Sequence, residues 1–133
     1  MIALDSNIIL RALTGDNAPQ ARTAQRVIET AQRAHTLLYI SDAVLCEVAW
    51  VLKRQNRAKR GDVAHILREI VETEQVVVDD NRRVEVAIDR YEHGRGDFAD
   101  YLICERALGA GATEVVTFDR ALRGEPGFRV LGS

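Results

Sequence analysis

The amino-terminal stretch MIALDSNII, residues 1–9, places a short apolar run directly before a polar turn and a helix-like apolar pattern. The run from Ile2 to Leu4 stops at Asp5, and Ile8 and Ile9 then begin a spacing that is typical of a helix. Similar short apolar runs occur at residues 37–40, 76–78, 115–118 and 128–131. Such runs are typical of strands that are buried on both faces of a parallel sheet.

Helical patterns separate these runs. The spacing of apolar residues predicts six helices, over residues 8–15, 19–31, 42–55, 61–74, 81–93 and 97–109. Strands that alternate with helices predict an α/β fold, here a three-layer α/β/α sandwich with a short parallel sheet. The chain has 133 residues and contains no linker or low-complexity segment, so we expect a single domain over residues 1–133.

The composition excludes several classes of protein. With 47% apolar residues, the chain is too hydrophobic for a disordered acidic tail. No apolar run approaches the ~20 residues of a membrane span, and the amino terminus lacks the pattern of a signal peptide. The two cysteines, Cys46 and Cys104, show no disulfide framework and suit a reducing compartment. We therefore expect a cytoplasmic protein with no membrane partner.

The net charge of −2 argues at first against a nucleic-acid partner, because such domains are often strongly basic. The 18 basic residues are, however, all arginine except Lys53 and Lys59, and arginine suits fork-like contacts to phosphate. If several acids are withdrawn into a metal site, the rest of the surface becomes slightly basic. The balance of charges thus leaves RNA open as a partner.

Two aspartates directly follow apolar strands. Asp5 ends the first predicted strand, and Asp119 ends the strand at residues 115–118. Ligands of open parallel sheets bind beyond the carboxyl ends of the strands, so both aspartates are candidates for a binding site. Each aspartate taken alone is more simply explained as a helix cap or a turn residue.

Glu47 is the only charged residue in the apolar segment from Ala43 to Leu52. A helix this apolar leaves few solvated directions, and a buried carboxylate without a partner is costly. Glu47 is therefore a functional acid, a residue on a narrow exposed stripe of its helix, or an acid that is paired with an arginine.

Asp97 and Asp100 lie at the start of the last predicted helix. They share one helix face with Ile103, Cys104 and Leu108, and this pattern predicts that the face points to the core. Asp97 has a simple explanation as a helix N-cap. Asp100 does not, because it continues the apolar face.

Asp5, Glu47, Asp100 and Asp119 thus all occupy positions where an acid is unfavourable. If they converge, two charges 4 Å apart repel by roughly 4 kcal/mol at an effective dielectric constant near 20. Protons or a divalent cation must then neutralise them. Oxygen ligands with no convergent histidine or cysteine favour Mg²⁺ or Mn²⁺ over Zn²⁺, and such an ion supports phosphoryl-transfer chemistry.

The ordered set of motifs resembles the PIN domain family, and within it the VapC-type toxin ribonucleases of bacterial toxin–antitoxin pairs. The motifs are Asp5-Ser6-Asn7 after a strand, Glu47 in an apolar helix, Asp97-Phe98-Ala99-Asp100 at a helix start, and Thr117-Phe118-Asp119 at a strand end. The resemblance covers nearly the whole chain. It implies a parallel α/β/α sandwich that cleaves RNA with Mg²⁺ or Mn²⁺, an antitoxin protein as partner, and a homodimer.

The resemblance also implies roles for individual residues. The acidic quartet that binds metal and performs catalysis would consist of Asp5, Glu47, Asp100 and Asp119. Asp97 would be an auxiliary acid, Ser6 or Asn7 would support Asp5, and Thr117 would face the site beside Asp119. Ser6 stands where the family more often has threonine. The choice of Asp97 or Asp100 as the direct ligand stays open, as does the number of metal ions.

Arg95 lies in a glycine-flanked loop just before Asp97 and is a candidate contact for a substrate phosphate. Three other functions fit part of the pattern. The first is a non-catalytic PIN-like RNA-binding module or scaffold. A receiver-type domain would need an acidic pair after the first strand and a lysine beyond Lys59, and a dehalogenase-type phosphatase would need an aspartate at Asn7.

Overall fold

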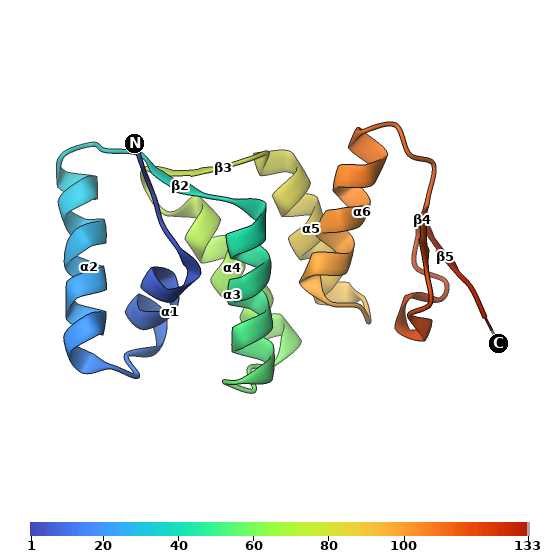
Figure 1. Ribbon diagram of the computed structural model, residues 1–133, viewed down its shortest axis with the longest axis horizontal. Coiled ribbons are helices and arrows are strands. Elements are labelled where there is room, and N and C mark those ends of the chain that lie inside the picture. Colours follow the sequence, from blue (N-terminus) through green and yellow to red (C-terminus); the bar gives the residue numbers. More distant parts are fainter. Residues whose placement is uncertain (133) are drawn as a thin grey trace.

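The chain folds into six α-helices and five short strands over residues 1–132, the part that this computed structural model describes (Figure 1). The helices are α1 (Ser6–Thr14), α2 (Ala18–Arg33), α3 (Asp42–Arg54), α4 (Arg60–Glu72), α5 (Asn81–His93) and α6 (Phe98–Gly109). The strands are β1 (Ile2–Ala3), β2 (Leu38–Ile40), β3 (Val76–Val78), β4 (Val115–Thr117) and β5 (Phe128–Val130), and a short 3-10 turn, η1 (Arg120–Leu122), follows β4. The predicted α/β class with short parallel strands is confirmed, and it is consistent with an α/β/α sandwich.

Local capping signals fix where the helices begin and end. Gly15 ends α1 with a left-handed backbone (φ 68°), and its N–H donates to the carbonyl of Arg11 at 3.1 Å. Pro19 lies in the first turn of α2, where its missing N–H costs nothing. The side chain of Asp80 accepts a hydrogen bond from the N–H of Arg83 at 2.9 Å and so caps α5.

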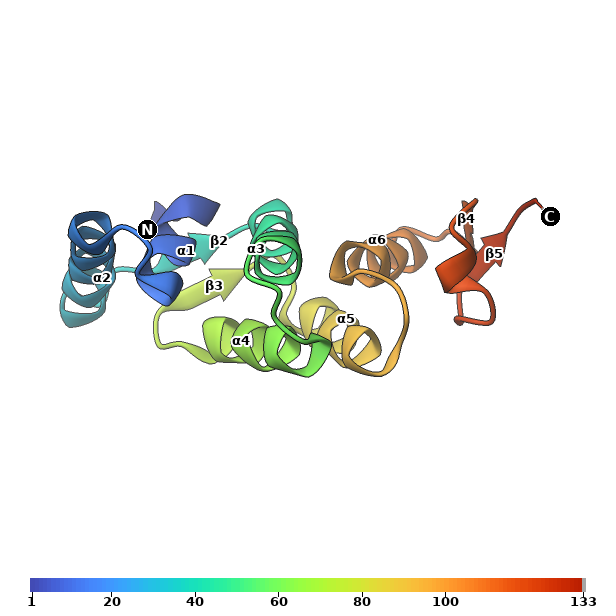
Figure 2. The same cartoon turned by 90° about the horizontal axis from the view of Figure 1, so that it is seen from below.

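The strands lie in two separate parallel sheets. The first has the order β1–β2–β3, with Ile2 beside Leu38 and Leu38 beside Val76. The second contains only β4 and β5, with Val115 beside Phe128. Figures 1 and 2 show an elongated molecule in which the second sheet lies at the carboxyl-terminal end, beyond α5 and α6, far from β1. Within residues 1–132, β1 and β4 therefore each have one edge with no neighbouring strand.

The main core lies between the first sheet and helices α3, α4 and α5. Leu38 from β2, Leu45 from α3, Leu67 from α4 and Ile88 from α5 are fully buried there. Apolar spacing along α4 predicts an inward face that includes Val63, Leu67 and Ile70, and the burial of all three confirms it. This core fixes the start of α1 and the middle of α3 relative to the first sheet.

The second sheet is attached to α5 and α6 by a half-buried arginine, Arg90. The guanidinium of Arg90 lies over the rings of Tyr101 and Phe128, 5.1 and 5.7 Å from their centres. It also donates a hydrogen bond to Glu105 at 3.0 Å and another to the carbonyl of Pro126. Because these contacts come from α5, α6 and the turn before β5, they hold all three together as one unit.

Candidate functional site

Asp5 lies at the carboxyl end of β1 and caps the first helix. Its Oδ1 accepts a hydrogen bond from the N–H of Ser6 at 2.7 Å, and Ser6 itself is buried. Asp5 remains exposed and lines a polar hollow of about 430 Å³ between α1 and α3. Ser6, Asn7, Asp16 and Glu47 line the same hollow. Two of the predicted acids, Asp5 and Glu47, therefore share one cavity.

Glu47 occupies the exposed stripe of α3 and not its buried face. The buried face of this helix carries Leu45, Val48, Ala49 and Leu52. The position of Glu47 on an exposed stripe, which the sequence left open beside a functional role, is confirmed, and this stripe faces the hollow that also contains Asp5. The carboxylate of Glu47 is exposed here and therefore accessible to a cation in solution.

Asp100 is half-buried at the start of α6. Its Oδ2 accepts a hydrogen bond from the N–H of Asp97 at 2.8 Å, which ties the two acids together across the first helical turn. Burial raises the pKa of Asp100 above its usual range, and the nearby carboxylates of Asp97 and Asp119 raise it further against the lowering effect of that hydrogen bond. Asp97, Asp100 and Asp119 therefore form one electrostatically coupled group.

Asp119 follows β4 and is held by two hydrogen bonds to its neighbours. Its N–H donates to Oγ1 of Thr117 at 3.1 Å, and its Oδ1 accepts from the N–H of Ala121 at 2.9 Å. Asp119 is exposed. Thr117 thus lies beside Asp119 and orients its backbone.

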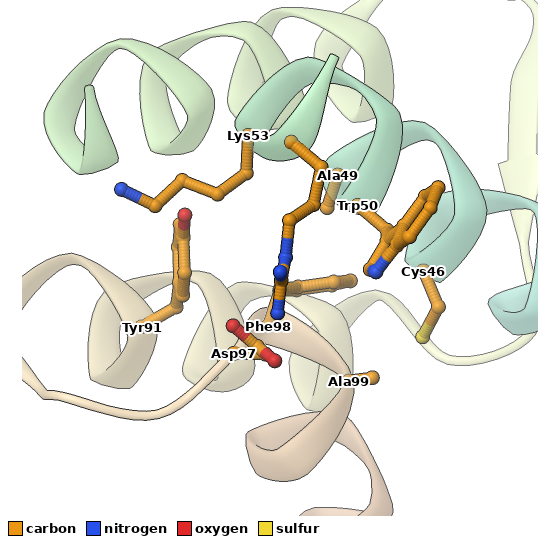
Figure 3. A pocket seen from close by; sticks show the side chains of 9 residues that line it. Cys46, Ala49, Trp50, Lys53, Tyr91, Asp97, Phe98 and Ala99 are labelled. Atoms are coloured by element: carbon orange, nitrogen blue, oxygen red, sulfur yellow. The ribbon is translucent and has the colours of Figure 1, made fainter. Parts of the chain in front are cut away.

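The predicted acids lie in two groups within one chain. Asp97 lines a second, small cavity of about 60 Å³ on a neighbouring face of α3, together with Cys46 and Trp50 (Figure 3). None of the residues that line it also lines the hollow of Asp5 and Glu47. Asp5 and Glu47 form the first acidic group, and Asp97, Asp100 and Asp119 form the second.

Helix α6 exposes part of the face that the sequence pattern assigned to the core. Ile103 is 54% exposed and Leu108 is 39% exposed, whereas Phe98, Tyr101 and Leu102 are buried. The prediction that Ile103 and Leu108 point to the core is therefore wrong for this chain. Helix α6 carries apolar residues on both sides, and its contacts with α5 bury only one of them.

Arg95 is exposed in the loop between α5 and α6. Its Nε donates to the carbonyl of Ala121 at 3.2 Å, and its Nη2 donates to the carbonyl of Arg123. Since a guanidinium has five N–H donors, these two bonds leave others for a further anion.

A separate set of potential metal ligands, on α5, was not predicted from the sequence. Asp89, Glu92 and His93 on α5 are, within residues 1–132, the one group of three potential metal ligands whose ligand atoms lie within 4.8 Å of one another. Arg68 pairs with Glu92 at 2.7 Å and with Asp89 at 3.9 Å. Arg68 is thus already a positive partner for these two carboxylates. The spacing of Asp89, Glu92 and His93 along one helix was the feature of the sequence that could have identified this group.

A charged cluster around the buried Asp42, at the carboxyl ends of β2 and β3, was also missed. Asp42 is only 3% exposed and lies 3.2 Å from Nε of Arg106 and 3.6 Å from Nη1 of Arg83. Burial, together with the neighbouring Asp79, raises the pKa of Asp42. Asp79 accepts hydrogen bonds from the hydroxyl of Tyr39 and from the N–H of Asp42. The two arginines explain this cluster as structural, because they connect α5 and α6 to α3.

The family comparison agrees with the α/β fold. The PIN domain model matches residues 2–124, and proteins with this domain are generally nucleases that use a divalent metal. No curated protein matches the chain significantly. None of the helices within residues 1–132 has the length and apolar character needed to cross a membrane. Since the match extends over nearly the whole sequence, the chain belongs to the PIN domain family.

Proposed function

We propose that this protein is a divalent-metal-dependent endoribonuclease, the toxin of a toxin–antitoxin pair, which hydrolyses phosphodiester bonds of RNA. The observation that carries the proposal is the second acidic group. Asp97 and Asp119 both raise the pKa of Asp100, and within residues 1–132 none of the three forms an ion pair. Unpaired carboxylates that repel one another favour a cation between them.

The chemistry of the donors fits Mg²⁺ or Mn²⁺. The first and second acidic groups offer only carboxylate oxygens, which are the ligands that these ions prefer. Asp5, Asp100 and Asp119 would hold the ion, with Asp97 as an auxiliary acid. Glu47 would bind a second ion through water or position the nucleophile. When bound, the ion lowers the pKa of water and neutralises charge on the phosphate.

The remaining predicted residues position these acids. The N–H of Ser6 donates to the carboxylate of Asp5 and so orients it. Oγ1 of Thr117 accepts the N–H of Asp119 and so orients the backbone that carries this acid. Asn7 lines the hollow beside Asp5 and would support it there. Arg95 would contact a substrate phosphate with the N–H groups that its two carbonyl partners leave free.

Single neutral replacements test this proposal. We expect Asp5→Asn, Glu47→Gln, Asp100→Asn and Asp119→Asn each to lower Mg²⁺-dependent RNA cleavage by about 100-fold or more, since loss of a supporting group alone costs 10–100-fold. Glu85→Gln, which changes an exposed acid on α5, is the matched control and should retain full activity. Full activity in all four variants would refute the proposal.

Metal binding separates the nuclease from the non-catalytic scaffold. A nuclease should show a thermal shift with Mn²⁺ that Asp5→Asn abolishes, because an ion that binds only the native state stabilises it. A scaffold that has lost its chemistry should show no such shift. A small DNA-binding antitoxin encoded next to this gene, which inhibits cleavage when it is added, is the expected biological partner.

A further inference from the structure

Strand β1 has an exposed edge and two exposed faces, which is unusual for a parallel strand. Parallel strands are normally buried on both faces. Ile2 is 42% exposed, the neighbouring Leu37 is 43% exposed, and Ala3 is exposed as well. Open strand edges pair readily with another strand, and proteins usually cover them.

The second sheet also has an open strand edge and exposed apolar residues. Strand β4 pairs with β5 on one side only, and Val116 and Phe118 are 48% and 77% exposed. Ile103 and Leu108 are also exposed on α6, the helix that lies next to the second sheet in Figure 1. An apolar face and an open edge of this kind indicate that another surface covers them.

The exposed area matches what a dimer of standard size buries. A compact monomer of 14.8 kDa exposes about 7,000 Å² of surface. This chain exposes 7871 Å², which is roughly 900 Å² more. Two chains that each covered this excess would bury about 1,800 Å² in total, within the range of specific protein interfaces.

The second sheet cannot move to its own β1 without breaking its attachments. Arg90 binds Glu105 and the carbonyl of Pro126, and the Tyr101 hydroxyl donates to Glu125 at 2.8 Å. Helix α5 and the loop after it are attached in turn to α4, because Arg60 of α4 donates to the carbonyls of Tyr91 and Gly96 at 2.8 and 2.6 Å. A second copy of the chain can supply the missing strand with all of these contacts intact.

From these observations we infer that two copies of the chain exchange their second sheets. β4 of each copy adds to the open edge of β1 of the other, which gives a continuous parallel sheet in the order β3–β2–β1–β4–β5. Both β1 and β4 are followed by an aspartate, so parallel pairing brings the first acidic group of one chain to the second acidic group of the other. Each site then consists of Asp5 and Glu47 from one chain and of Asp100 and Asp119 of the partner subunit.

The role of the exchange in catalysis rests on the proposed nuclease function, whereas the pairing of the strands does not. The first experiment therefore measures activity in a mixed dimer. Asp5→Asn and Asp119→Asn chains are co-expressed with different affinity tags and purified through both tags. In the exchanged dimer one site carries both substitutions and the other carries neither, so we expect about half of the wild-type activity, with each homodimer inactive. A mixed dimer as inactive as its parents overturns the shared site.

The second experiment measures the strand contact without activity. Ile2 and Val116 each lie three residues before their aspartate, so they should be neighbours in the exchanged sheet. Chains with Ile2→Cys and chains with Val116→Cys are co-refolded and treated with a short bismaleimide. We expect a covalent species of twice the 14.8 kDa chain mass in the mixture only. Each single variant and the wild-type chain, which contains Cys46 and Cys104, are the controls.

The outcomes of the two experiments are distinguishable. A cross-link in the mixture with no RNA cleavage by the wild type would support the exchange and refute the nuclease proposal. RNA cleavage by the wild type with no cross-link in the mixture would support the nuclease proposal and overturn the exchange. A chain that carries both cysteines and becomes linked internally as a monomer would show that β4 returns to its own β1, which also overturns the exchange.

Discussion

The N–H of Asp97 donates a hydrogen bond to Oδ2 of Asp100 at 2.8 Å, so the acid proposed to bind metal also caps the helix that carries it. Capping and catalysis are therefore separable by substitution. Asn at position 100 keeps an oxygen that can accept this bond, whereas Ala does not. We expect Asp100→Asn to retain the wild-type melting temperature and to lose RNA cleavage. Asp100→Ala should lose cleavage and also about 1 kcal/mol of stability, measured by urea unfolding. Equal stability of the two variants would contradict the capping role.

Arg90 connects α5, α6 and the second sheet, and its loss should destabilise the protein more than the loss of a surface arginine. Arg90→Met removes the cation from Tyr101 and Phe128 and leaves Glu105 half-buried without its partner. We expect a loss of about 2–4 kcal/mol in the free energy of unfolding. Arg82→Met on the same helix is the matched control, because Arg82 is exposed, and it should change stability by less than about 0.5 kcal/mol.

Gly96 has no room for a side chain. A Cβ at this position would lie 2.5 Å from Cδ2 of Leu122 and 3.2 Å from Oδ2 of Asp100. We expect Gly96→Ala to cost about 1–3 kcal/mol, because Leu122 is fully buried and must shift. Gly61→Ala in α4 is the control, since a Cβ there meets nothing within 4 Å, and it should be neutral or stabilise the helix by up to about 1 kcal/mol. Equal melting temperatures for the two variants would contradict this packing.

The hydrogen bond from Tyr39 to Asp79 should make stability depend on pH in the acid range. This bond is the main reason why the pKa of Asp79 lies below its ordinary value of 3.8. A carboxyl whose pKa is lower in the folded protein stabilises the fold above pH 3.8, and this contribution is lost as the pH falls through the folded pKa. The melting temperature of the wild type should therefore fall more steeply below about pH 4 than that of Asp79→Asn. Tyr39→Phe removes the donor and should flatten the wild-type profile in the same way.

Local signals in the sequence were sufficient for the helices. The predicted bounds of α5, Asn81 to His93, agree with the structure, because Asp80 caps its start and the glycine-containing loop that begins at Gly94 ends it. Gly15 likewise ends α1 as predicted. Such signals depend on a few neighbouring residues, so no information about the rest of the chain is needed.

The pairing of strands was not accessible in the same way. Nothing in the two-residue strand β1 or the three-residue strand β4 says which strand each should pair with, since both are short apolar runs. The apolar residues on both sides of α6 raise the same difficulty. Ile103 and Tyr101 are equally good core residues, and only the position of α5 decides that Tyr101 is the one buried.

The acids of the candidate site could be named from the sequence, but their distribution could not. Position after a strand singled out Asp5 and Asp119, and the apolar context singled out Glu47. Whether these side chains meet depends on where the second sheet lies, which is a property of the assembled fold. The placement of all four in one site therefore remains a prediction.

The attachment of the second sheet by Arg90 has a consequence for the order of folding. Its partners, from residue 101 to residue 128, follow it closely along the chain, so these contacts close only short loops. We therefore expect this part of the chain to reach its structure rapidly and independently of protein concentration. The joining of β1 to β4 is instead bimolecular in the exchanged dimer. Refolding should show a fast first-order phase followed by a slower phase whose rate increases with protein concentration.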